Sequence, residues 1–313
     1  MTVAILLVLL ALAGCVTGAV YTARVESNYQ TERFVDVEGT QIHARLSGTD
    51  GPVVVMIHGA SANAHEFDWS LAPLLSDDHR VLMVDRPGHG YSKRPKNGHT
   101  LGTQADLIAK AVAELAPDEP AVIVGHSFGG AVALRMALDR PEQVSALVLL
   151  TPVTHDWGEG GTAWYNRAVT HPVIGPVFRQ LVPLVGPAQA EGGVVSVFDP
   201  APPPEDYAQR AGLPLLFRPH VFRNNAQDVI ALRDELAAQE DRYDTLDLPI
   251  TVFSGALDTV ISPKFHVGKL KHQADLDLVK LQNGGHMPHH THSEDIADVI
   301  RAYAAQAASN AAE

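Results

Sequence analysis

Short apolar segments typical of strands alternate with segments of helical periodicity over most of the chain. Such alternation predicts right-handed strand–helix–strand units, and therefore a mostly parallel central sheet flanked by helices. Strands are expected at residues 53–57, 80–84, 121–124, 144–150, 250–254 and 276–281, and helices at residues 66–75, 101–115, 130–138, 263–272 and 293–308.

The alternation is preceded by a hairpin signal and interrupted once. Residues 33–48 read as two strands around Glu38-Gly39, which is a turn pair. From residue 154 to residue 244, Pro- and Gly-rich stretches mix with helix-like pieces instead. We therefore predict a core of residues 25–153 and 245–313, with residues 154–244 inserted as a helical cap.

The N-terminal segment from Val3 to Tyr21 contains no charged residue. Its nineteen residues, at about 1.5 Å rise each, approach the ~30 Å hydrocarbon core of a bilayer. Residues 1–24 are thus expected to be a membrane anchor or a signal segment, and we favour a single transmembrane anchor. Arg24 and Arg33 follow the apolar run, which favours a cytoplasmic main domain but leaves the side of the membrane open.

Two alternatives for the N-terminus remain open. Leu12-Ala-Gly-Cys15 resembles the box of bacterial lipoproteins, whose cysteine is acylated after cleavage, and Ala11-Leu-Ala13 fits a signal-peptidase site. Against both, no Lys or Arg precedes the apolar run. Cys15 is the single cysteine, so an internal disulfide is excluded and the redox compartment is undetermined.

The overall charge narrows the class of partner. The 313 residues carry a formal net charge of −13. A nucleic-acid partner would require a basic surface that neutralises phosphates, so we expect none. The oligomeric state is left open.

The stretch from Val122 to Val132 (VIVGHSFGGAV) passes from an apolar strand into a helical pattern at a serine. A serine hydroxyl is a weak nucleophile until a base removes its proton, so it has to project into a cleft. A sharp strand-to-helix turn achieves this, and Gly125, Ser127 and Gly129 form the corresponding G-x-S-x-G pattern. Short motifs also arise by chance in loops, so the pattern needs support from the rest of the chain.

Four landmarks in the same order support it, and through them residues 33–308 resemble the α/β-hydrolase superfamily. His58-Gly59 follows the first parallel strand, and the segment from Asp85 to Ser92 (DRPGHGYS) follows the next. The serine corner comes third, and Gly285-His286 follows the last strand. The resemblance implies an α/β-hydrolase fold with a cap.

The resemblance also implies roles for individual residues. Ser127 would be the nucleophile and His286 the general base. The backbone N–H groups of Ala60 and Phe128 would form the oxyanion hole. A carboxylate has to orient His286, and Asp258, after the strand 250–254, is our candidate because the fold uses the order Ser, Asp, His.

Alternatives to two of these acidic roles stay open. Asp156, after the strand 144–150, is the second candidate for the triad, since some relatives carry the acid there. Asp258 would then only cap the following helix. Asp85 lies in a landmark loop, and we expect it to fix that loop rather than to catalyse.

The sixteen histidines suggest a metal, and residues 286–292 (HMPHHTH) hold the densest cluster. Their spacing matches no standard zinc pattern, and Pro288 interrupts the helix that would align ligands. We therefore expect no metal and no cofactor. His58, His89 and His126 are candidates for tying loops together around the site by hydrogen bonds.

A triad of this kind implies acyl transfer, and we predict a hydrolase of carboxylic esters. Relatives that resemble epoxide hydrolases and haloalkane dehalogenases have an aspartate at the position of Ser127, which separates them from this chain. Carbon–carbon bond hydrolases and thioesterases remain alternatives within the same fold. A non-catalytic module that binds a ligand is the alternative from another class.

Substrate choice is expected to reside in the cap, because a cap shapes the acyl pocket and excludes water. Its aromatic residues suggest a small or medium apolar substrate. Candidate pocket residues are His58, Trp157, Trp164 and Phe217. The alternative for each cap aromatic is a place in the cap's own small core.

Overall fold

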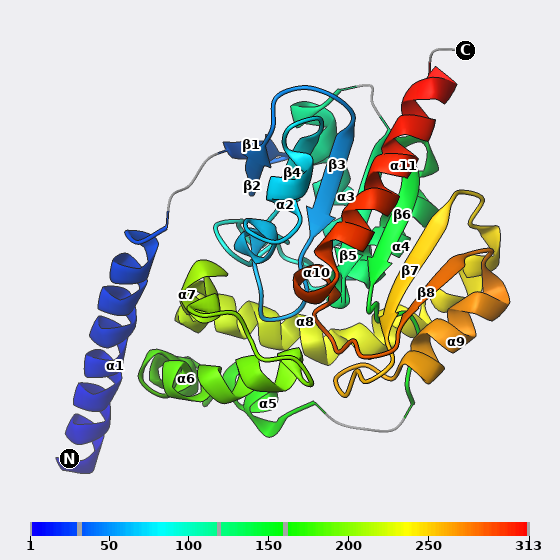
Figure 1. Ribbon diagram of the computed structural model, residues 1–313. Coiled ribbons are helices and arrows are strands. Elements are labelled where there is room, and N and C mark those ends of the chain that lie inside the picture. Colours follow the sequence, from blue (N-terminus) through cyan, green and yellow to red (C-terminus); the bar gives the residue numbers. More distant parts are fainter. Residues whose placement is uncertain (1, 30–32, 118–119, 159–161, 312–313) are drawn as a thin grey trace.

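The computed structural model describes residues 2–29, 33–117, 120–158 and 162–311 (Figure 1). Within them lies one eight-stranded sheet with the order β1-β2-β4-β3-β5-β6-β7-β8. The strands from β3 to β8 are parallel to their neighbours, whereas β2 is antiparallel to both β1 and β4. The bounds are β1 Arg33–Val37, β2 Thr40–Ser47, β3 Val53–Ile57, β4 Arg80–Val84, β5 Ala121–His126, β6 Val144–Leu150, β7 Ile250–Gly255 and β8 Asp277–Leu281.

Helices cover both faces of the sheet because its central strands are apolar on both sides. In β3, Val53, Val55 and Ile57 pack in one core with α3 (Leu101–Leu115), α4 (Phe128–Asp139) and α9 (Pro263–Gln273). Val54 and Met56 face the other way, into a second core with α2 (Ala72–Leu75) and α11 (Ser293–Ala311). Figure 1 shows α11 in front of the sheet and α4 behind it.

The connection from β6 to β7 carries the helices of the cap. They are α5 Trp164–Thr170, α6 Gly175–Phe198, α7 Tyr207–Arg210, η3 Leu213–Phe217, α8 Pro219–Ala237 and η4 Glu240–Thr245. The cap has a small apolar core of its own, which contains Val182, Leu216, Phe217 and Val221. At the other end of the chain, the N-terminal helix α1 (Thr2–Glu26) packs against α6 (Figure 1).

The structure confirms the mostly parallel sheet flanked by helices, and β1 and β2 form the expected hairpin. Residues 66–75 are not one helix. A 3₁₀ turn, η1 (Ala64–Phe67), precedes α2, and Pro73 in the first turn of α2 has no N–H with which to continue a preceding helix. The boundaries of the cap and of the N-terminal segment stay predictions.

The helical α1 is consistent with the apolar N-terminal run, but the side chains of residues 2–13 lie outside the described part of the structure. Among the described residues, α6 is the helix that has both the length and the apolar composition of a membrane span. Only a small part of its apolar stretch is buried in the protein. Such a helix in a cap was not anticipated from the sequence.

Candidate active site

Ser127 occupies a strained corner between β5 and α4. Its φ of 51° and ψ of −113° lie outside the regions that non-glycine residues favour. Such a conformation costs free energy and persists only where the surrounding structure enforces it. The Ser127 N–H donates to the Leu150 carbonyl at 2.9 Å, which ties the corner to the end of β6.

The two glycines of the motif allow the close approach that forms the corner. A Cβ on Gly125 would lie 2.6 Å from the Gly129 oxygen, and a Cβ on Gly129 would lie 2.1 Å from the Ile57 oxygen. Any side chain at either position would therefore push α4 away from the ends of β3 and β5. Both glycines are required for packing.

His286 follows β8, and Asp258 follows β7, so both come from neighbouring carboxyl ends of the sheet. His286 Nδ1 lies 2.8 Å from Asp258 Oδ2. The other carboxylate oxygen, Oδ1, accepts the N–H groups of Val260 and Ile261 at 2.8 and 2.9 Å. Asp258 thus accepts the Nδ1 proton, which leaves the Nε2 lone pair of His286 available. Among the described residues, neither Nε2 nor the Ser127 hydroxyl has a hydrogen-bond partner.

Asp156 lies elsewhere. Its backbone N–H donates to the Glu240 carboxylate at 2.7 Å, and its own Oδ1 accepts the Gly158 N–H at 2.8 Å. Arg233 Nε is 3.8 Å from the same Oδ1. The structure therefore brings Asp258, and not Asp156, against His286.

The turn after β3 places a backbone amide beside Ser127. A Cβ on Gly59 would lie 3.3 Å from Ser127 Cβ, so the turn adjoins the serine. The Gly59 carbonyl accepts from His58 Nδ1 at 2.8 Å and from Arg86 Nη2 at 3.1 Å. Because a trans peptide is planar, the Ala60 N–H points the opposite way from that carbonyl. Arg86 and His58 thus fix the orientation of this N–H.

Arg86 is itself held by the cap. Its Nη1 donates to Asp228 Oδ2 on α8 at 2.9 Å and to Gln104 at 2.8 Å, and all three side chains are buried. The guanidinium also lies 4.1 Å from the ring of Phe128, the first residue of α4. Burial lowers the pKa of Arg86 to about 10, while Asp228 acts in the opposite direction. Burial also raises the pKa of Asp228, against the effect of the two arginines Arg86 and Arg94.

A buried acid, Glu66, connects the oxyanion turn with both catalytic loops. Its Oε2 accepts the Gly59 N–H at 3.1 Å, and its Oε1 contacts His126 Nδ1 and lies 3.2 Å from His289 Nε2. His126 Nε2 lies 3.0 Å from the His286 carbonyl oxygen. Glu66 therefore ties together the turn at Gly59, the residue before Ser127 and the loop of His286.

The same three side chains have the ligand types of a metal site, since their donor atoms lie within 4.8 Å of one another. Glu66 Oε1 and His126 Nδ1 are in direct contact, which leaves no room for an ion between them. Burial alone would lower the pKa of His126, but the Glu66 carboxylate raises it. Burial would raise the pKa of Glu66, but His126 and His289 hold it well below its usual range. The geometry fits an ion pair better than a metal centre.

Comparison with known proteins identifies the fold. An esterase from Exiguobacterium antarcticum superimposes with a TM-score of 0.70 at 24% identity, over 87% of this chain and 98% of the esterase. An epoxide hydrolase superimposes with a TM-score of 0.72 at 18% identity, over 88% and 99% of the two chains. A sequence model of the α/β hydrolase fold matches residues 52–184. The chain belongs to the α/β-hydrolase superfamily.

Curated relatives of this α/β hydrolase match over shorter regions. The dihydrolipoyllysine-residue acetyltransferase component of the acetoin cleaving system of Cupriavidus necator is 33% identical over 164 residues, which are 52% of this chain and 42% of that protein. A 2-hydroxy-6-oxononadienedioate/2-hydroxy-6-oxononatrienedioate hydrolase of Cupriavidus pinatubonensis is 33% identical over 142 residues, 43% and 47% of the two chains. The chain spans less than half of the length of these relatives.

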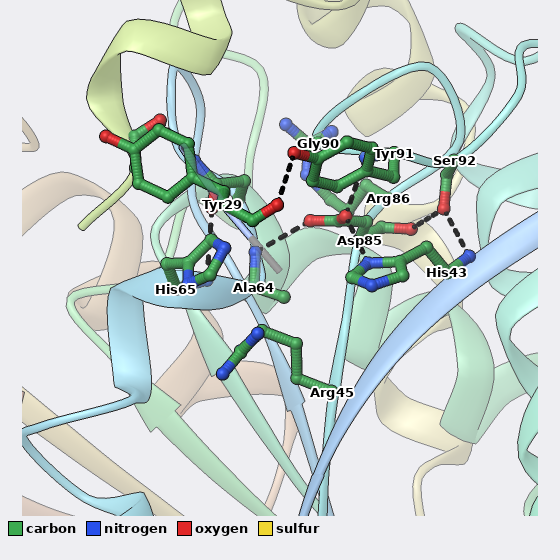
Figure 2. Close-up of polar contacts among 12 residues, drawn as sticks. Tyr29, His43, Arg45, Ala64, His65, Asp85, Arg86, Gly90, Tyr91 and Ser92 are labelled. Atoms are coloured by element: carbon green, nitrogen blue, oxygen red, sulfur yellow. Dashed lines mark hydrogen bonds and ion pairs between the residues drawn. The ribbon is translucent and has the colours of Figure 1, made fainter. Parts of the chain in front are cut away.

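The loop after β4 in this α/β hydrolase is organised by Asp85, as expected. Figure 2 shows its carboxylate contacting His43 and Ala64. Oδ2 lies 2.7 Å from His43 Nδ1 and accepts the Tyr91 N–H at 2.8 Å, while Oδ1 accepts the Ala64 N–H at 2.7 Å. Burial would raise the pKa of Asp85, but the hydrogen bond and charge of His43 lower it to about 2. Asp85 holds a loop and has no free oxygen for catalysis.

The structure corrects two predictions about the substrate pocket. Trp164 is 70% exposed on the outer side of α5, so it does not line an internal pocket. His58 is fully buried with both ring nitrogens engaged, because Nδ1 contacts the Gly59 carbonyl and Nε2 accepts the Arg86 N–H at 3.0 Å. Burial and Arg86 lower the pKa of His58 to about 4, so it is neutral. His58 therefore supports the oxyanion turn and does not contact substrate.

The other two pocket candidates lie at the cap. Phe217 packs within the cap's apolar core beside Val182 and Val221, which is the alternative considered for it. Trp157 is partly buried, with its ring centroid 6.3 Å from that of His266. A pocket role for Trp157 stays a prediction.

The buried His286 predicts how activity depends on pH. Burial lowers its pKa below the ordinary value of 6.5, although the hydrogen bond to Asp258 acts in the opposite direction. Only neutral His286 can accept the Ser127 proton, so kcat/KM should fall as pH decreases through this lowered pKa. We expect an acid limb with its midpoint below pH 6.5, measured on a p-nitrophenyl ester between about pH 4.5 and 8. A midpoint at or above pH 7 would contradict the assignment of His286 as the base.

Proposed function

We propose that this protein is a serine hydrolase that cleaves carboxylic esters of small or medium apolar substrates through an acyl-enzyme at Ser127. The observation that carries the proposal is the combination of a strained serine corner with a buried His286–Asp258 pair 2.8 Å apart. The similarity in fold to an esterase supports the same class of chemistry. An N-terminal anchor through residues 3–21 would attach the enzyme to a membrane, with the side left open.

The proposed reaction follows from the roles of the named groups. His286 Nε2 accepts the Ser127 proton while Oγ attacks the ester carbonyl carbon, and the oxyanion accepts hydrogen bonds from the N–H groups of Ala60 and Phe128. The ester C–O bond then breaks, and the departing alcohol takes the proton from His286. A water that gives its proton to His286 attacks the acyl-enzyme, and its collapse releases the acid and restores the Ser127 hydroxyl. No step requires a cofactor.

The runner-up is a carbon–carbon bond hydrolase or a thioesterase with the same residues. One observation favours keeping it, because a curated relative at 33% identity is a hydrolase of an oxodienedioate. A non-catalytic ligand-binding module is the third possibility, and in that case the serine would not be activated.

The full-length protein should hydrolyse p-nitrophenyl esters, tested from acetyl to palmitoyl, and a fluorophosphonate probe should label it at Ser127. Labelling reports an activated serine whatever the substrate, and mass spectrometry of the labelled peptide identifies the residue. The chain length with the highest kcat/KM measures the acyl pocket. Labelling without turnover of any ester would favour the carbon–carbon hydrolase, and neither labelling nor turnover by a folded protein would favour the binding module.

A further inference from the structure

The outer face of α5 and α6 in the cap is apolar and exposed. Of the fifteen large apolar side chains that are exposed in the described part of the chain, eleven belong to α1, to α5, to α6 or to the turn between α5 and α6. The most prominent on the cap are Trp164, Val173, Val177, Leu181, Leu184 and Val185. Isolated exposed apolar residues are normal, but a contiguous group marks an interaction surface.

This face also has an unusual charge. Residues 162–190 contain Arg167 and Arg179 and no Asp or Glu, in a chain whose formal net charge is −13. Repulsion between Arg179 and Arg223, together with burial, lowers the pKa of Arg223, which places a further cation beside the face. An apolar surface with a positive border is complementary to a bilayer that contains anionic lipids.

The orientation of α6 fits a helix that lies along a membrane rather than across it. Val182, Val194 and Phe198 are buried against the rest of the protein, while Leu181, Leu184 and Val185 on the same helix are exposed. A helix with one face packed on a domain and the other face apolar buries that face in the interfacial region. Trp164 and Tyr165 on α5 are residue types enriched at that depth.

The N-terminal helix approaches the bilayer from the same edge. A Cβ on Gly14 would lie 3.1 Å from Gln180 Cβ, and Pro219 lies equally close to Gly18, so α1 crosses the cap at these glycines. In Figure 1 the N-terminal end of α1 extends past α5 and α6 at the lower edge of the molecule. The residues before Gly14 are the apolar run of the proposed anchor. An acylated Cys15 would bring lipid to the same level.

We propose that the α5–α6 face is a second membrane contact, which lies in the interface of the bilayer that α1 anchors and holds the cap against the lipid surface. The proposal rests on the anchor part of the proposed function and is independent of the reaction at Ser127. It commits to lipid as the occupant of the face, and a second copy of the chain is the competing occupant.

The test uses single-cysteine versions of the full-length protein in vesicles of phosphatidylcholine and phosphatidylglycerol. A polarity-sensitive fluorophore is attached to native Cys15, to C15S/L184C on α6, and to C15S/A305C on the exposed side of α11. Emission is recorded with a lipid-borne nitroxide quencher near the headgroups, with one near the bilayer centre, and with aqueous iodide. We expect the label at position 184 to be quenched by the shallow nitroxide and shielded from iodide, and the label at position 305 to show the reverse.

The outcomes separate the two proposals. Lipid quenching at Cys15 without lipid quenching at position 184 would overturn the inference and leave the anchor intact. A label at position 184 that is shielded from iodide yet unaffected by either nitroxide would mean that a second copy covers the face, which also overturns it. No lipid quenching at Cys15 or at position 184 would overturn both the anchor and the inference. Quenching of position 184 by the central nitroxide alone would show that α6 crosses the membrane, against a surface contact.

Discussion

Replacing Ser127 with alanine is expected to lower kcat for ester hydrolysis by a factor of about 10⁴ to 10⁶. The variant keeps the oxyanion amides and the cap but has no oxygen that can form the acyl-enzyme. Alanine has to adopt the same φ of 51°, so the strain at the corner is unchanged and the fold should persist. Steady-state turnover of the best p-nitrophenyl ester, measured beside the melting temperature, tests both parts.

Ser145→Ala is the matched control for this variant. Ser145 lies on β6 with a buried hydroxyl that has no hydrogen-bond partner among the described residues, so its loss should leave kcat unchanged. Fluorophosphonate labelling should persist in Ser145→Ala and disappear in Ser127→Ala. Turnover by Ser127→Ala within tenfold of the wild type would refute an acyl-enzyme at this position.

The parts of the site that could be predicted from the sequence are those with local signals. Ser127 is flanked by glycines at fixed spacing, and it follows a strand whose apolar period ends there. Asp258 and His286 follow strands that the same period identifies, and parallel strands bring their carboxyl ends to one edge of the sheet. Local pattern plus strand order was therefore sufficient to propose which residues meet.

The supporting residues could not be predicted in the same way. Arg86 and Asp228 meet across 142 positions, and nothing in the helical pattern of residues 219–237 distinguishes Asp228 from a solvated acid. Glu66 was read as an ordinary residue of a helix, although it is buried. A possible signal was the position of both Arg86 and Glu66 within landmark loops, where charged residues need partners.

The amphipathic character of the cap was also hidden. Pro183 and Pro187 lie inside α6, and prolines normally indicate the end of a helix. Packing of Val182 and Phe198 into the cap stabilises α6 despite these prolines. Trp164 was assigned to a pocket because an aromatic residue in a cap suggests an apolar wall, whereas the structure places it on the outside. Sequence composition indicates that apolar surface exists but not which way it faces.

The second large effect is expected at Arg86, whose replacement by leucine should destabilise the fold by about 3–5 kcal/mol. Asp228 is fully buried and would lose one of its two arginine partners, and an uncompensated buried charge is costly. Urea denaturation followed by circular dichroism measures the loss. In the same variant the Gly59 carbonyl loses one of its two donors, so kcat should also fall.

The double variant Arg86→Leu/Asp228→Leu separates these two effects. Removing both buried charges should recover much of the stability, since apolar replacements of a buried pair are often neutral or better. Arg94, the other partner of Asp228, is partly exposed and can be solvated. The Gly59–Ala60 peptide still lacks its guanidinium donor, so kcat should stay about 10- to 100-fold below the wild type while KM changes little. Recovery of stability and kcat together would show that Arg86 only supports the fold. Recovery of stability alone would establish it as a positioning residue, through which the cap residue Asp228 influences the oxyanion hole.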